Sequence, residues 1–71
     1  MKLKANDYEA KDILKIMREW TELTQIEFAD SVGLSNKSIQ AYELGVKHCL
    51  FNVFLAIAKE HGIEITLEKK K

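Results

Sequence analysis

Residues 24–45 constrain the fold more than any other part of the chain. Thr24 followed by Glu27 is the pattern of a capping box, which marks the start of a helix. Gly33 ends that segment at a position where glycine adopts a left-handed conformation at little steric cost. Ser35 is a favourable N-cap for a second short helix. The pattern therefore predicts two short helices joined by a tight turn.

The second of these helices is expected over residues 36–44, with Gly45 ending it. Small or apolar residues stand where two crossed helices require them, at Ala29, Gly33 and Ile39. Ile26 belongs to the group expected to face the interior. Two short helices joined in this way form a helix-turn-helix unit, whose second helix enters the major groove of DNA.

Patterns outside this unit predict two more helices and one strand. Residues 7–20 are expected to form a helix capped by Asn6 or Asp7, because apolar side chains repeat there at helical spacing. A strongly apolar helix is expected to end at Gly62. Apolar and polar residues then alternate over residues 63–68, which is typical of a strand.

Length and composition exclude several classes of protein. The 71 residues correspond to one domain, 1–71, whose small core predicts marginal stability and favours oligomerisation. The sequence has no membrane-length apolar run and no signal peptide, and its single cysteine fits the cytoplasm. It also has no metal-ligand spacing and no nucleophile–base arrangement. We therefore expect no metal, no cofactor and no enzymatic activity.

The charge balance argues against nucleic acid at first sight, because the formal net charge is zero and DNA-binding domains are usually basic. The charges are segregated, however. Residues 21–31 carry three acidic and no basic residues, whereas residues 32–50 carry two lysines and one glutamate. Such segregation is what a one-sided binding surface requires.

A set of residues in a fixed order extends the pattern beyond the two short helices. It comprises Arg18, Leu23, Thr24, Gln25, Phe28, Ala29, Val32, Gly33, Leu34, Ser35, Ser38, Ile39, Glu43, Gly45, Leu55, Ile57, Ala58 and Gly62. In this respect residues 14–62 resemble the Xre/Cro-like helix-turn-helix family, to which the lambdoid phage repressors belong. The resemblance implies a mainly α, four-helix lambda-repressor-like domain. The chain departs from the family where a proline usually stands near Cys49, and where residues 63–68 replace a frequent fifth helix.

The resemblance assigns one group of side chains to DNA. The group consists of Gln25, Ser35, Asn36, Lys37, Gln40, Ala41, Lys47 and His48. Gln25 would bond a phosphate, with simple helix capping as the alternative. Asn36 and Gln40 offer paired groups to adenine, Lys37 reaches guanine or a phosphate, and Ala41 contacts a thymine methyl. Lys47 and His48 would follow the sugar–phosphate backbone. The alternative for the residues of the second short helix is a solvated polar surface, and for Lys47 and His48 it is a charged surface turn.

The resemblance also implies two structural roles. Arg18 and Glu43 would form a partly buried ion pair between the first and third helices. The strand at 63–68 looks like one that joins two subunits in small autoregulating antitoxins and some Cro-type repressors. Ile63, Ile65 and Leu67 would then mediate dimerisation by antiparallel pairing about a two-fold axis.

Two functions from different classes remain open on the sequence. The first is a sequence-specific DNA-binding transcription regulator, a repressor or autoregulator that acts as a homodimer on a palindromic operator. The second is a protein-interaction module, such as an antitoxin whose main partner is a toxin, which the neutral charge favours slightly. The sequence does not give the operator, the regulated genes or the host.

Overall fold

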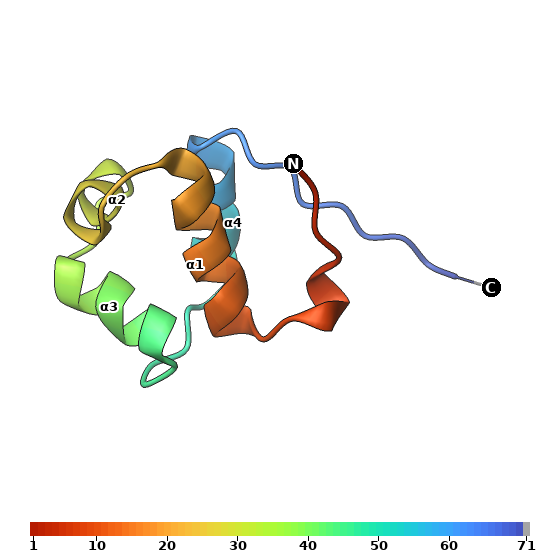
Figure 1. The fold of residues 1–71 in the computed structure, drawn as a ribbon, viewed down its shortest axis with the longest axis horizontal. Coiled ribbons are helices and arrows are strands. Elements are labelled where there is room, and N and C mark those ends of the chain that lie inside the picture. The colour runs from red at the N-terminus through yellow and green to blue at the C-terminus, as the bar shows by residue number, and fades with distance from the viewer. Residues whose placement is uncertain (71) are drawn as a thin grey trace.

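The computed structural model describes residues 1–70 and consists of helices joined by short connections. Figure 1 shows α1 crossing in front of α4, with α2 and α3 together at one end and the two terminal segments at the other. In chain order the elements are the 3₁₀ turn η1 (Ala5–Asp7), α1 (Ala10–Thr21), α2 (Gln25–Ser31), α3 (Asn36–Leu44) and α4 (Phe51–Glu60). The expected mainly α architecture with four α-helices is confirmed.

Local side-chain chemistry fixes the start of α2. The Thr24 hydroxyl accepts a hydrogen bond from the Glu27 amide at 3.2 Å, and the Glu27 carboxylate accepts one from the Thr24 amide at 3.0 Å. The two bonds form the predicted capping box, which satisfies two amides at the helix start. The hydrogen bond from the Thr24 amide is the main cause of the lowered pKa of the Glu27 carboxyl, and the Thr24 side chain lowers this pKa further.

Glycines end both helices of the central pair as expected. Gly33, with φ of 71°, occupies the left-handed region in the turn after α2. Ser35 then caps α3 by accepting a hydrogen bond from the Ser38 amide at 3.1 Å. Gly45, with φ of 79°, ends α3. The turn between α2 and α3 is therefore set by glycine and serine at the positions that the sequence indicates.

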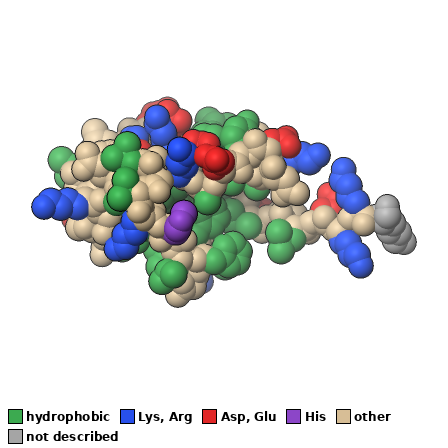
Figure 2. Space-filling model, turned by 90° about the horizontal axis from the view of Figure 1, so that it is seen from below, with side chains coloured by type: hydrophobic (Ala, Val, Ile, Leu, Met, Phe, Trp, Pro, Cys, Tyr) green, Lys and Arg blue, Asp and Glu red, His purple; other side chains and the backbone are tan. Residues whose placement is uncertain are grey.

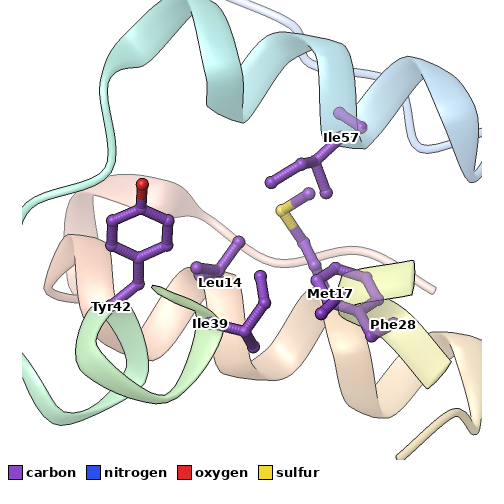
Figure 3. Packing of buried hydrophobic residues seen from close by; sticks show 8 residues of the cluster. Leu14, Met17, Phe28, Ile39, Tyr42 and Ile57 are labelled. Carbon is purple, nitrogen blue, oxygen red and sulfur yellow. The ribbon is translucent and has the colours of Figure 1, made fainter. Parts of the chain in front are cut away.

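The core draws equally on all four α-helices. Figure 3 shows Ile39 of α3 lying between Leu14 and Met17 of α1 and Phe28 of α2, with Ile57 of α4 pointing toward Met17. Among residues 1–70 the buried set is Leu14, Met17, Phe28, Ala29, Ile39, Tyr42, Ile57 and Ala58, two from each helix. Full burial of a side chain of this kind contributes roughly 1.5–3 kcal/mol, so α3 is held in place chiefly by Ile39 and Tyr42.

A polar contact that the sequence did not reveal joins α2 to α4. Ser31 Oγ and His61 Nε2 lie 2.9 Å apart, and the His61 ring stacks on Phe28 with the ring centroids 5.0 Å apart. His61 caps the end of α4. The contact positions the C-terminal end of α4 against α2.

Two details of the helices differ from the sequence predictions. The first α-helix begins at Ala10, and Glu9 is its N-cap without a side-chain cap bond, so neither Asn6 nor Asp7 caps it. The chain is extended at Tyr8, which separates η1 from α1. Ile26 is 66% exposed, because it lies in the first turn of α2, about 200° around the helix from the buried Phe28.

The strand predicted at residues 63–68 is absent, since residues 61–70 contain no strand in the structure. Ile63 packs against the core, whereas Ile65 and Leu67 are exposed. Alternation of apolar and polar residues permits a strand, but a strand also needs a hydrogen-bonded neighbour. No second strand exists in the described part of the chain, so the expected dimerising role of Ile63, Ile65 and Leu67 as a strand has no support.

Candidate nucleic-acid interface

The outer face of α3 carries polar side chains that are free of the core. Asn36, Lys37 and Gln40 are exposed, and Ala41 is partly exposed, while Ile39 and Tyr42 on the reverse face are buried. Because successive helical residues rotate by about 100°, Lys37, Gln40 and Ala41 share one face of the helix. Asn36 lies at the first turn. The structure thus brings these four predicted residues together on one short, rigidly backed helix.

Ser35 differs from its neighbours because its hydroxyl is already engaged. The Ser35 oxygen accepts from the Ser38 amide at 3.1 Å, and the Ser35 hydroxyl donates to Ser38 Oγ at 3.0 Å. Both bonds lie within the cap of α3. The geometry gives Ser35 a structural task at the edge of the face.

Leu44 is a member of this face that the sequence analysis did not single out. It stands four residues after Gln40 and seven after Lys37, and 65% of its surface is exposed. The signal was its helical spacing, which places it beyond Ala41 on the outward side. Val46 is exposed just after the helix. The face therefore ends in apolar side chains, which suit the methyl group of thymine better than a phosphate.

A single carboxylate links α1, α2 and α3 behind this face. Glu43 accepts hydrogen bonds from Arg18 Nε at 2.7 Å and Arg18 Nη2 at 3.0 Å. Gln25 Nε2 donates to the same carboxylate at 3.2 Å, and Arg18 Nη1 donates to the Leu23 carbonyl at 3.2 Å. The side chains of Arg18 and Glu43 are only 17% and 5% exposed. The expected contact between Arg18 and Glu43 is present, with Gln25 as a third member.

The contacts of Arg18 and Glu43 determine the protonation of both side chains. Burial raises the pKa of the Glu43 carboxyl, but the hydrogen bonds from Arg18 and Gln25 outweigh it, and the net pKa is lowered. The hydrogen bond to Glu43 raises the pKa of Arg18 despite its partial burial. Both partners therefore stay charged at neutral pH. Gln25 keeps one amide hydrogen and its carbonyl oxygen for another partner.

The loop after α3 returns two exposed side chains to the same end of the molecule. The Lys47 amide donates to the Ala41 carbonyl at 3.3 Å, and Lys47 Nζ lies 5.9 Å from the centre of the Tyr42 ring. His48 is exposed beside it. Figure 2, which views the molecule from the side of this loop, shows a histidine among lysine, arginine and hydrophobic side chains. Lys47 is thereby placed against the C-terminal end of α3 by an aromatic ring.

Lys11 of α1 also reaches this region. A Cβ atom placed on Gly45 would lie 2.9 Å from Lys11 Cδ, so the lysine stem runs directly across the glycine. Lys11 Nζ lies 3.7 Å from Glu9 Oε2, and both side chains are well exposed. The spacing of residues along α1 gave no sign of this contact between Lys11 and Gly45.

Two other kinds of function find no support in the described part of the chain. Within residues 1–70, no cluster of three or more His, Cys, Asp or Glu side chains could hold a metal ion. No helix described in the structure is both long and apolar enough to cross a membrane.

Two short crossed helices, with the second held by the core on one side and polar on the other, define a DNA-binding domain of the helix-turn-helix class. A family model described as "Helix-turn-helix" matches residues 14–67. The chain belongs to this Xre/Cro-like helix-turn-helix family, whose domain is typical of DNA-binding transcription regulators. No curated protein and no solved structure gave a significant match to the chain.

Proposed function

We propose that this protein reads a specific DNA sequence by placing α3 in the major groove. The observation that carries the proposal is the two-sidedness of α3, on which Ile39 and Tyr42 are buried while Asn36, Lys37 and Gln40 are exposed. A helix fixed from behind presents its polar groups in one orientation, and fixed orientation is what discrimination between base edges needs.

Each exposed side chain of α3 has a preferred partner in the groove. Asn36 and Gln40 each carry an amide that pairs with the N6 and N7 positions of adenine. Lys37 donates to guanine or to a phosphate, and Ala41 contacts a thymine methyl. One good paired contact discriminates against the wrong base by about 1–3 kcal/mol.

The remaining residues of the proposed site position the domain on the DNA backbone. Lys47 and His48 lie in the loop after α3 and would contact phosphates, which fix the register of the domain on DNA without reading its sequence. Gln25 would contact a phosphate through the part of its amide that Glu43 leaves unused. Ser35 is proposed as a further contact at the edge of the site, secondary to its role in the cap of α3.

The proposed regulator is a cytoplasmic homodimer that represses transcription by occupying a palindromic operator in a promoter. The support for a dimer is the small size of the reading surface, because one short helix contacts only a few base pairs. Two copies related by a two-fold axis read two half-sites about 34 Å apart, and the symmetry of the protein then matches that of the site.

Selection of bound duplexes from a random pool tests this proposal directly. The expected result is enrichment of one sequence whose two halves are inverted copies about one helical turn apart. Affinity for the enriched duplex should also fall steeply with salt, since each phosphate contact releases counterions. A folded protein that enriches no sequence, at any salt concentration, would contradict the proposal.

A protein-interaction module, for example an antitoxin that holds a toxin, is the second candidate. The zero net charge favours it, since a domain that relies on phosphate contacts is usually basic. The exposed Leu50 and Phe51 also favour it, because apolar side chains on the surface suit a protein partner. Binding to DNA that is weak and insensitive to salt would support this candidate over the first.

A further inference from the structure

Lys11 belongs to the first turn of α1, but its side chain lies at the C-terminal end of α3. A Cβ atom placed on Gly45 would be 2.9 Å from Lys11 Cδ and 3.8 Å from Lys11 Nζ. Gly45 is the C-cap of α3. The lysine stem therefore crosses the end of α3, and its ammonium group is held beside the residue at which that helix stops.

The sequence of α3 supplies no cation at this end of the helix. Its last turn contains no basic residue, and the exposed side chains there, Leu44 and Val46, are apolar. The carbonyl groups at the C-terminal end of a helix carry partial negative charge, which favours a cation beside them. Lys11 provides that cation from α1.

Two side chains of the loop after α3 lie at the same end. Lys47 and His48 stand two and three residues after Gly45, so the Lys47 Cα is within about 7 Å of the glycine Cα. The Lys47 amide is fixed by its hydrogen bond to the Ala41 carbonyl at 3.3 Å. Lys11, Lys47 and His48 also line the same open groove. They form one group of exposed nitrogen-bearing side chains around the end of α3.

In the folded chain, Lys11 has a weakly held carboxylate partner. The other two cations on this face of α1 act on a largely buried carboxylate, since Arg18 donates to Glu43 and the charge of Lys15 helps to lower the pKa of Glu43. Lys11 pairs instead with Glu9, whose Oε2 is 3.7 Å from Nζ, and the two side chains are 43% and 75% exposed. An ion pair this exposed contributes little to stability, so another anion can replace the carboxylate.

The proposed placement of α3 determines which anion this end of the helix meets. In a helix-turn-helix domain, the N-terminal residues of the second helix contact base edges. The nine residues of α3 form a helix about 13 Å long, and the major groove is about 12 Å wide. The C-terminal end of α3 therefore lies toward the edge of the groove, where the phosphates stand.

We propose that Lys11 is a further contact of this protein to a DNA phosphate, which replaces Glu9 as the partner of its ammonium group. This inference rests on the proposed function for the placement of α3 in the groove. It extends the contact with the DNA backbone from the loop after α3 to α1. Because the phosphate takes the place of the carboxylate, Glu9 competes with DNA for Lys11.

Two lysines that undergo the same change provide a matched test. Lys11→Gln removes a charge at the end of α3, and Lys59→Gln removes one from the last turn of α4. In a plot of log affinity against log salt concentration, Lys11→Gln should have a slope less steep than that of the parent by about 0.9 per bound copy. Between about 50 and 200 mM salt, the affinity of the parent should therefore fall by a factor about 3.5 times larger than that of the variant. Lys59→Gln should keep the slope of the parent, and so should Lys11→Arg, which retains the charge.

Glu9→Gln tests the competition between the carboxylate and the phosphate. It should raise affinity for DNA about two- to threefold, because the ammonium group of Lys11 then has no carboxylate to release. The gain should shrink in a chain that also carries Lys11→Gln. An equal gain with and without the Lys11 charge would show that Glu9 acts on DNA directly, which would overturn the competition.

The remaining outcomes separate this inference from the proposed function. Circular dichroism first shows that each variant is folded at the temperature of the titrations. A phosphate contact carries no sequence information, so Lys11→Gln should lose the same factor on the selected and the scrambled duplex. Equal slopes for the parent and Lys11→Gln, or a loss confined to the selected duplex, overturn the inference while the parent still binds. A parent that binds no duplex at any salt concentration rejects the proposed function itself, and this contact with it.

Discussion

At the scale of single residues, the Glu43 carboxylate joins α3 to two other α-helices. It receives hydrogen bonds from Arg18 and Gln25, which come from the first and second α-helices. None of the three side chains is fully exposed. Gln25, a proposed DNA contact, and Arg18, a structural residue, therefore both donate to the Glu43 carboxylate.

Loss of either charge at this point should act through stability. Arg18→Ala or Glu43→Ala leaves its partner largely buried without compensation, which costs about 3–5 kcal/mol. Thermal and denaturant unfolding should show this loss, with site preference unchanged in the fraction that remains folded. Lys59→Ala, an exposed change on α4, serves as the control. Unchanged melting together with lost DNA binding would show instead that Arg18 contacts DNA.

The lowered pKa of Glu43 predicts a loss of stability in acid. A carboxyl whose pKa is lower in the folded than in the unfolded state stabilises the fold fully above its ordinary value of 4.5. The stabilisation disappears as the pH falls through the lower, folded value, because the unfolded chain then binds the proton more readily. Urea unfolding between pH 6 and pH 3 should therefore show a smaller dependence on pH for Glu43→Gln than for the parent. Parallel curves for the two proteins would contradict this.

Single substitutions should separate the residues proposed to read bases from the residue proposed to contact a phosphate. Asn36→Ala and Lys37→Ala should lower affinity for the selected duplex by about 1–3 kcal/mol and leave binding to scrambled DNA nearly unchanged. Gln25→Ala should weaken binding to both duplexes alike, because a phosphate contact carries no sequence information. Fluorescence anisotropy on the two duplexes measures the difference. Equal losses on both for Asn36→Ala and Lys37→Ala would reject their role in reading bases.

At the scale of elements, the two glycines that end α2 and α3 differ in their surroundings. Gly33→Ala would meet nothing within 4 Å, whereas Gly45→Ala would meet the stem of Lys11. Both changes carry the cost of a left-handed residue, about 1–2 kcal/mol. Gly45→Ala should cost more in denaturant unfolding, and the excess should vanish when Lys11→Ala is added. An excess that persists without the Lys11 side chain would show that the contact is not its cause.

The elements that the sequence predicts well are those fixed by local chemistry. The capping box of Thr24 and Glu27, the turn at Gly33 and the cap by Ser35 all depend on residues within a few positions of each other. The prediction of a strand over residues 63–68 was wrong. A strand needs a second strand to pair with by hydrogen bonds, and a local sequence pattern does not show whether one is present. The contact of Ser31 with His61 and that of Lys11 with Gly45 join distant positions, which one sequence does not reveal.

The sequence also predicted those parts of the candidate site that depend on local spacing, and missed a contact between distant positions. Helical spacing and the family resemblance selected Lys37, Gln40 and Ala41, which share a face in the structure. Leu44 was missed because it was read only as the end of the helix, although the same spacing includes it. The link between Gln25 and Glu43 was missed because it spans 18 positions in the sequence.

At the scale of the whole molecule, each α-helix supplies two of the eight side chains buried among residues 1–70. Removal of any one helix would therefore remove a quarter of the buried side chains and expose those that pack against it. A domain with a core this small and this evenly shared should unfold in a single cooperative step. The two central helices are consequently not expected to fold apart from α1 and α4.

Because the core is shared evenly among the helices, few residues of α3 are needed for packing. The buried Ile39 and Tyr42 and the Glu43 carboxylate hold α3 to the rest of the fold, and the outward positions 36, 37, 40, 41 and 44 contribute no buried side chain. Under the proposed function, substitution at those positions should change the preferred DNA sequence while the fold is retained. A lineage of such domains can therefore acquire new targets by altering five side chains, and laboratory selection can follow the same route.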